Sequence, residues 1–115
     1  LPGGLVEIQN GPAGMMMVKR KVFKKLIKDY PEREIKIHPH QNTFPKDLRI
    51  YNFWDCNFKD GIWKGEDIFF CDLARQSGFK VYANISSTLT HHGSFGYKGK
   101  YEDKFKMKNK NGTKN

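Results

Sequence analysis

Two adjacent carboxylates, Glu66 and Asp67, follow Gly65 and begin a segment whose apolar residues recur at helical spacing. A carboxylate at the mouth of a pocket can take a proton from a hydroxyl group and so act as a general base. Acidic residues in a first helical turn are also favoured by the helix dipole alone. The pair is therefore either a catalytic base with its neighbour or a plain helix start. Trp63, just before them, offers an aromatic ring that either stacks on a bound molecule or packs in the core.

The helix that positions these acids is predicted to span residues 66–77. Gly78 ends the helix. Its apolar residues lie on one side: Phe69, Phe70, Leu73 and Ala74. A second amphipathic helix is predicted over residues 20–30, with lysines on its outer face and Pro31 at its end.

The rest of the chain predicts short strands and loops around these helices. Before the helix at 66–77 we expect a strand at 5–8, a loop at 10–14, a buried strand or entry segment at 15–18, a possible strand at 35–37, a strand at 48–54 and a loop at 55–64. After it we expect a strand at 79–83 and an extended run from 87 to His91-His92. His38-Pro39-His40 reads as a loop. The predicted fold is α/β or α+β, with a small mixed sheet and two main helices.

Composition permits one domain at most, because the chain has 115 residues. The 21 basic and 12 acidic residues give a net charge of +9, which can attract nucleic acid, anionic lipid or phosphorylated small molecules. Most such charge is a solvated face or a tail, so nucleic acid is not the favoured partner. Because the chain shows neither a membrane span nor a signal peptide, we expect a cytoplasmic protein.

The two cysteines, Cys56 and Cys71, are predicted to be buried free thiols in aromatic surroundings. No C-x-x-C spacing is present, so a zinc-stabilised fold using both cysteines with His91 or His92 is the least favoured of three readings.

The order of these segments resembles the C-terminal, acceptor-side half of a GT-A-fold, family-2-like glycosyltransferase. Members of that group often show an acid pair, an aromatic residue, Phe-Cys, a glycine, a strand and then His-x-Gly-Ser. The matching residues are Glu66, Asp67, Phe70, Cys71, Gly78, Val81, Tyr82, Leu89, His91, Gly93, Ser94 and Gly99. An earlier run, Gly11-Pro12-Ala13-Gly14-Met15-Met16 followed by Arg20 and Phe23, is similar to the mid-chain loop and helix of the same enzymes. The resemblance covers roughly residues 4–100.

The resemblance implies transfer of a sugar from a nucleotide-sugar to the hydroxyl of a glycan or another acceptor. Asp67 corresponds to the usual catalytic base, and Glu66 would orient the acceptor or hold the loop. His91 corresponds to the late histidine that can complete the shell of a divalent metal, Mn or Mg. Substrate binding is assigned to Trp63, Gly65, Gly14 and Asn10.

One motif of the family is missing, because no Asp-x-Asp occurs in these residues. Together with a start at Leu-Pro-Gly-Gly, this suggests a piece of a longer enzyme that is inactive by itself, binds no metal and self-associates through an exposed face. We expect residues 1–100 to belong to the transferase-like domain and residues 101–115 to form a basic, mobile tail. The alternative is a small basic module that binds nucleic acid or another polyanion.

Overall fold

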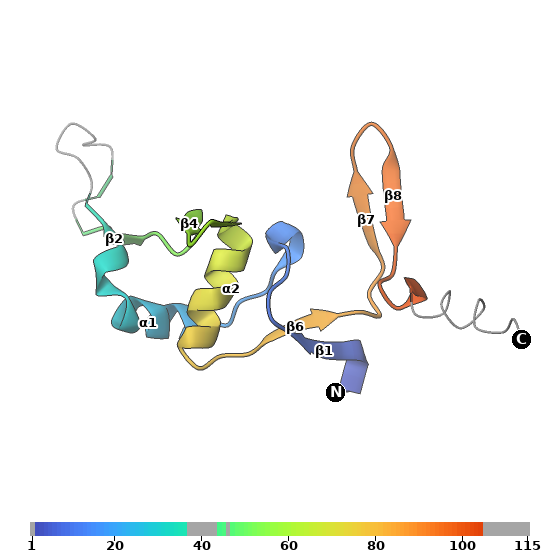
Figure 1. The fold of residues 1–115 in the computed structure, drawn as a ribbon, viewed down its shortest axis with the longest axis horizontal. Coiled ribbons are helices and arrows are strands. Elements are labelled where there is room, and N and C mark those ends of the chain that lie inside the picture. The colour runs from blue at the N-terminus through green and yellow to red at the C-terminus, as the bar shows by residue number, and fades with distance from the viewer. Residues whose placement is uncertain (1, 37–43, 46, 105–115) are drawn as a thin grey trace, which may run out of the picture. The chain divides into compact units, whose positions relative to one another are not determined.

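The computed structural model describes residues 2–36, 44–45 and 47–104, which form an α+β chain (Figure 1). The chain divides into two units, one formed by Leu1–Ile8 with Tyr82–Asn115 and the other by Gln9–Val81. Predictions about the segment 37–43, which includes His38-Pro39-His40, and about the tail beyond residue 104 lie outside the described residues.

Both predicted helices are confirmed, and both lie in the Gln9–Val81 unit. Helix α1 spans Arg20–Asp29 and helix α2 spans Glu66–Gln76. Their apolar faces meet in a core of Leu26, Phe53, Phe69, Phe70 and Leu73. Helix α2 stops where expected, because Gly78 takes a φ of +86°, a left-handed conformation that glycine adopts without the clash of a Cβ atom.

A hairpin replaces the loop predicted for residues 55–64, and that prediction was wrong. Strands β4 (Asn57–Lys59) and β5 (Ile62–Lys64) pair antiparallel, with Phe58 opposite Trp63. The link is Asp60-Gly61, with φ values of 54° and 75°. Positive φ at both positions gives the turn whose twist matches a two-residue hairpin. Three-residue strands are too short for their alternation to be read from the sequence.

The same unit contains one more strand pair and a loop segment. Strand β2 (Glu34–Ile35) pairs antiparallel with β3 (Ile50–Tyr51), so the strand predicted over 48–54 is shorter than expected. Short 3₁₀ turns occur at η2 (Ala13–Met15) and η3 (Pro31–Arg33). Residues 15–18 were predicted as a buried strand or an entry segment, and the strand does not form: Met15 ends η2, and the residues after it lead into α1 with Met16 and Val18 packed against the core.

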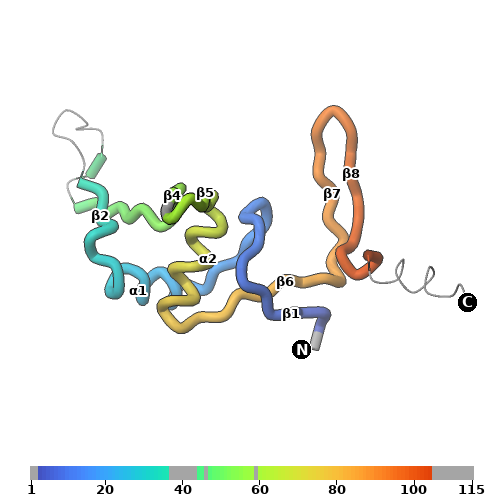
Figure 2. Tube along the Cα trace, viewed as in Figure 1, coloured from blue at the N-terminus to red at the C-terminus, as the bar shows by residue number. Residues whose placement is uncertain are grey.

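The other unit is built from strands and has no deeply buried side chain among its described residues. Turn η1 (Pro2–Gly4) leads into β1 (Leu5–Ile8), which lies beside β6 (Val81–Asn84). Strands β7 (Leu89–His92) and β8 (Gly96–Gly99) form an antiparallel hairpin (Figure 2). Gly4 has a φ of +71°, and a Cβ there would lie 2.1 Å from Ser86 Oγ, so this close approach requires glycine.

The predicted mixed sheet is corrected by this topology. In the described chain the strands pair in twos, and the pairs β2–β3, β4–β5 and β7–β8 are all antiparallel. The paired strands are only two to four residues long, and short turns join the two strands of β4–β5 and of β7–β8.

Among the described helices, neither α1 nor α2 has the length and apolar character needed to cross a lipid bilayer.

Candidate functional site

The first turn of α2 holds both predicted catalytic acids. Gly65 is the N-cap residue and provides no side-chain cap, so backbone N–H groups of the first turn remain available. Asp67 is half-buried, and its Oδ1 accepts a hydrogen bond from the Ile68 N–H at 2.7 Å. A Cβ on Gly65 would lie 3.4 Å from that same oxygen, which is an ordinary van der Waals contact, so the Asp67 carboxylate lies directly beside the Gly65 Cα.

Asp67 lies on the face of α2 that contacts the Gly11–Gly14 loop. The Cys71 thiol, one helical turn after Asp67, donates to the Gly11 carbonyl oxygen at 3.9 Å. Burial is the main cause that raises the pKa of Cys71, and the negative charge of Asp67 adds to the increase. Two motifs more than fifty residues apart in the sequence therefore lie side by side in the fold.

Glu66 has a different neighbourhood from Asp67. Its Oε2 lies 4.0 Å from the Cys56 Sγ, at the start of the β4–β5 hairpin. Cys56 is exposed, whereas Cys71 is buried, so the prediction of two buried thiols is right only for Cys71. Glu66 therefore lies beside the start of the hairpin, whereas Asp67 lies one helical turn before Cys71, which contacts the glycine-rich loop.

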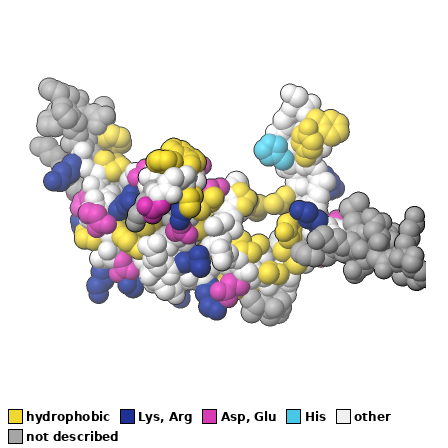
Figure 3. Space-filling view, viewed as in Figure 1, with side chains coloured by type: hydrophobic (Ala, Val, Ile, Leu, Met, Phe, Trp, Pro, Cys, Tyr) yellow, Lys and Arg dark blue, Asp and Glu magenta, His cyan; other side chains and the backbone are white. Residues whose placement is uncertain are grey.

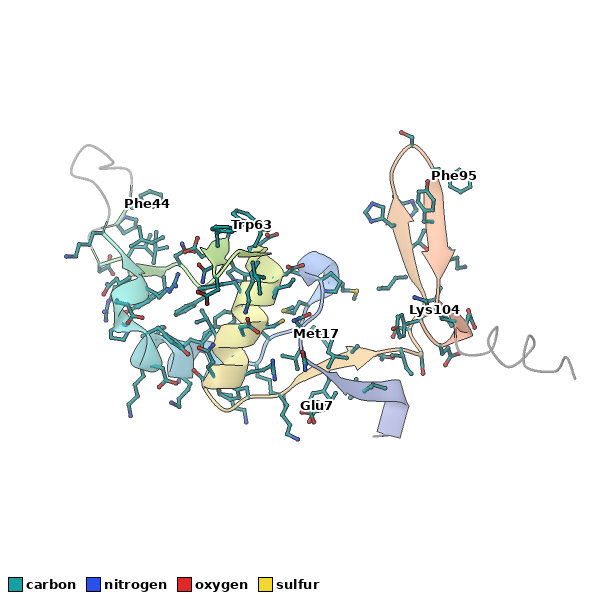
Figure 4. The ribbon with its side chains drawn as sticks, in the orientation of Figure 1. Glu7, Met17, Phe44, Trp63, Phe95 and Lys104 are labelled. Atoms are coloured by element: carbon teal, nitrogen blue, oxygen red, sulfur yellow. The ribbon has the colours of Figure 1, made fainter. Side chains whose placement is uncertain are left out.

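Trp63 is accessible rather than part of the core. It is 65% exposed, and its cross-strand neighbour Phe58 is 67% exposed. Figure 4 labels Trp63 on the hairpin, and Figure 3 shows hydrophobic side chains gathered over this part of the chain. Of the two alternatives left open by the sequence, simple core packing is excluded for Trp63. Its contact with a sugar stays a prediction.

Asn10 and Gly14 flank the loop that reaches Cys71. Asn10 is exposed and directly precedes Gly11, and Gly14 lies inside η2 with open space around its Cα. The loop is therefore close to the Asp67 face of α2, although no contact joins Asn10 or Gly14 to Asp67 itself. Their predicted roles in binding a substrate stay predictions.

A groove of about 490 Å³ runs along a different face of α2, and the sequence did not predict it. Its floor includes Phe69 and Leu73, and the β4–β5 hairpin forms one wall. Its two cations are held by partners within the unit: Lys64 by Asp72, and Arg33 by Asp55 at 2.9 Å. The spacing of Phe69, Asp72, Leu73 and Gln76 along one helical face was the available signal, but it also fits ordinary core packing.

His91 belongs to the other unit, where it lies on β7 opposite Tyr97 of β8. The part of the chain that the structure describes contains no group of three His, Cys, Asp or Glu side chains able to hold a metal ion. That includes the set of Cys56, Cys71 and His91 or His92 considered for zinc. Divalent ions such as Mg²⁺ and Mn²⁺ need several ligands, so His91 alone does not form a metal site.

Comparison of the chain with protein-family models, curated proteins and solved structures finds no match.

Proposed function

We propose that this chain is the acceptor-side half of a GT-A-fold glycosyltransferase in which Asp67 is the catalytic base. The observation that carries the proposal is the contact between Cys71 and the Gly11 carbonyl. It brings the glycine-rich loop against the helix that begins with the acid pair, and these are the two segments on which the family resemblance rests.

The chemistry assigned to Asp67 needs a carboxylate that a hydroxyl group can reach. Asp67 is half-buried at the first turn of α2, beside Gly65. In the proposed step, Asp67 accepts the proton of the acceptor hydroxyl while the hydroxyl oxygen bonds to the sugar carbon. The bond between that carbon and the nucleoside diphosphate breaks, and the diphosphate leaves with its electron pair.

Glu66 and Trp63 are proposed to orient the acceptor. Glu66 is exposed in the first turn of α2, and Trp63 offers an exposed aromatic ring three residues earlier. Aromatic rings give large apolar contact area with little loss of conformational entropy. Gly65, Gly14 and Asn10 would leave the approach to Asp67 unobstructed.

The divalent ion of the proposal, Mn²⁺ or Mg²⁺, stabilises the charge on the departing diphosphate when bound. The described residues do not supply its ligand set, so its main ligands are assigned to a donor-binding half that carries the Asp-x-Asp motif. His91 remains a proposed additional ligand.

The proposal is tested by measuring release of nucleoside diphosphate from a panel of UDP- and GDP-sugars with Mn²⁺. The assay compares the 115-residue chain with the longer enzyme that contains it. We expect release only from the longer enzyme. Metal-dependent turnover by the 115-residue chain alone would contradict the assignment of the donor site to another segment.

A second candidate function, polyanion binding, is favoured by the outer face of α1. Lys21, Lys24 and Lys28 are all exposed there, and among the residues that the structure describes Lys25 is the one basic residue of this helix with an ion pair, to Asp29. Binding of this kind would weaken steeply with salt. It would be lost in a Lys21→Gln, Lys24→Gln, Lys28→Gln variant and unaffected by Asp67→Asn.

A further inference from the structure

An exposed asparagine directly precedes a glycine in the loop that contacts α2. Asn10 and Gly11 lie between β1 and η2, outside any helix or strand, and Asn10 is exposed. Because Gly11 has no side chain, its backbone nitrogen can approach the side-chain carbonyl carbon of Asn10 without a steric clash. An Asn-Gly pair is therefore open to attack by the backbone nitrogen on the side-chain amide.

The hydrogen bonds of the loop leave both reacting groups free. Among the residues that the structure describes, neither the Gly11 N–H nor the Asn10 side chain makes a hydrogen bond. The contact of this pair with α2 is made instead by the Gly11 carbonyl oxygen, which accepts from the Cys71 thiol at 3.9 Å. The loop is thus held at its carbonyl, and the nitrogen that would react is not engaged.

Asn84 is also exposed, but its surroundings are the opposite. The next backbone nitrogen, that of Ile85, donates to the Gly4 carbonyl oxygen at 3.0 Å, and its β-branched side chain crowds the approach. The Asn84 Oδ1 accepts hydrogen bonds from the N–H groups of Ser86 and Ser87 at 3.0 and 3.1 Å. Both reacting groups are therefore already engaged at Asn84, which makes it an internal control for Asn10.

We propose that Asn10 is a site of spontaneous deamidation in the folded chain, with water as the co-reactant. The Gly11 backbone nitrogen gives up its proton to solvent and bonds to the side-chain carbonyl carbon of Asn10. The bond from that carbon to Nδ2 breaks, and Nδ2 takes a proton from solvent and leaves as ammonia. Water then opens the five-membered imide at either carbonyl, which gives aspartate or isoaspartate.

The products change the loop in two ways. Either product replaces a neutral amide with a carboxylate, on the side of α2 whose first turn already holds Asp67. In isoaspartate the main chain also runs through the side-chain carbon, so one carbon atom is added directly before Gly11. The reaction does not depend on the proposed glycosyl transfer, but it removes the amide of a residue assigned to substrate binding.

The test is peptide mapping by mass spectrometry of the 115-residue chain, aged at neutral pH and body temperature. The tryptic peptide of residues 1–19 contains Asn10 and no other Asn or Asp, so its deamidation is read separately from that of Asn111-Gly112. We expect Asn10 to react at least about tenfold faster than Asn84, where the β-branched neighbour hinders attack. An isoaspartyl methyltransferase should also transfer methyl groups from S-adenosylmethionine to the aged peptide.

Two variants and the unfolded chain decide the outcome. Asn10→Gln should abolish methylation of this peptide, whereas Asn84→Gln should leave its rate unchanged. The native rate at Asn10 should lie within about fivefold of the rate in guanidinium, because an unprotected loop opens at almost no free-energy cost. A smaller ratio of Asn10 to Asn84 rates, greater protection in the native chain, or a peptide still methylated in Asn10→Gln would each overturn the proposal.

Discussion

Neighbouring residues of one helix turn have separate environments in this chain. Glu66 lies beside Cys56, which precedes the hairpin. Asp67 lies on the same helix face as Cys71, whose thiol contacts the Gly11 carbonyl. Adjacent residues on a helix point about 100° apart, so an acid pair at its start necessarily serves two surfaces. The division of labour proposed for the pair, a base and an orienting group, follows this geometry.

The two cysteines should differ sharply in reactivity. Burial raises the pKa of the Cys71 thiol, whereas Cys56 is exposed. A higher pKa leaves less thiolate at pH 8, and the thiolate is the form that reacts. We expect iodoacetamide to modify Cys71 at least about tenfold more slowly than Cys56. Mass spectrometry of the alkylated peptides checks this, with denatured chain as the control. Equal rates in the native chain would show that Cys71 is not buried.

Leu26 is the residue whose truncation should cost the most stability on α1. It is fully buried, whereas the next residue, Ile27, is 37% exposed. Leu26→Ala removes buried methyl groups and leaves a cavity, so we expect a loss of about 2–5 kcal/mol in the free energy of unfolding. Ile27→Ala should cost less than about 1 kcal/mol. Urea denaturation followed by circular dichroism measures both. Similar losses would contradict the packing described for α1.

At the scale of elements, both helices were predictable but only some of the strands were: the strand predicted at 5–8 matches β1, and the extended run predicted from 87 to 92 contains β7. Both helices have an apolar face, and each is followed by residues that end a helix: Tyr30-Pro31 after α1 and Gly78 after α2. The spacing of the apolar residues and the stop residues therefore indicate the same bounds. The β4–β5 hairpin has only three residues on each strand, and its Asp60-Gly61 turn was recognised without the strands that it joins. In the β7–β8 hairpin only β8 was missed, because residues 96–99 contain two glycines and no alternation.

The candidate site was predictable only in part. Glycine followed by two acids indicated a helix start, and the first turn of α2 confirms that position. The approach of the Gly11 loop to Cys71 depends on tertiary packing between segments sixty residues apart, which no local pattern encodes. The exposure of Met15 and Met17 was also unpredictable, because an apolar run of four residues ordinarily indicates a buried strand.

The end of α2 depends on the conformational freedom of Gly78. Its φ of +86° is unfavourable for a residue with a side chain, so Gly78→Ala should cost about 1–2 kcal/mol in the free energy of unfolding. Gly14→Ala is the matched control, because Gly14 has no positive φ and has open space around it. That variant should change stability by less than about 0.5 kcal/mol. Thermal unfolding compares them, and an undisturbed Gly78→Ala chain would contradict the left-handed stop.

At the scale of the whole molecule, the two units differ in how much they bury. All the deeply buried residues described lie in the Gln9–Val81 unit, and β7 and β8 are exposed along their whole length. Segments with few buried contacts open locally at low free-energy cost. Hydrogen exchange should therefore be slow for residues 66–77 and fast for residues 89–99. Equal protection of the two segments would show that the hairpin is buried in solution.

The overall charge of the chain and the charge of the Asp67 region favour different proposed functions. The net charge of +9 would favour a polyanion, but the Asp67 region that supports glycosyl transfer contains two adjacent acids. A variant that removes negative charge at Asp67 should leave polyanion binding unchanged or strengthen it, while it removes the proposed base. Only transfer chemistry predicts a loss.

The most direct measurement is therefore sugar transfer by the longer enzyme carrying Asp67→Asn, beside a matched variant, Asp72→Asn. Both substitutions neutralise one carboxylate of α2, but Asp72 pairs with Lys64 and lines the groove. Loss of a general base lowers kcat by about 10²–10⁴-fold, and we predict this for Asp67→Asn with folding retained. Asp72→Asn should keep most of the activity. Full transfer by a folded Asp67→Asn enzyme would contradict the assignment of Asp67 as the base.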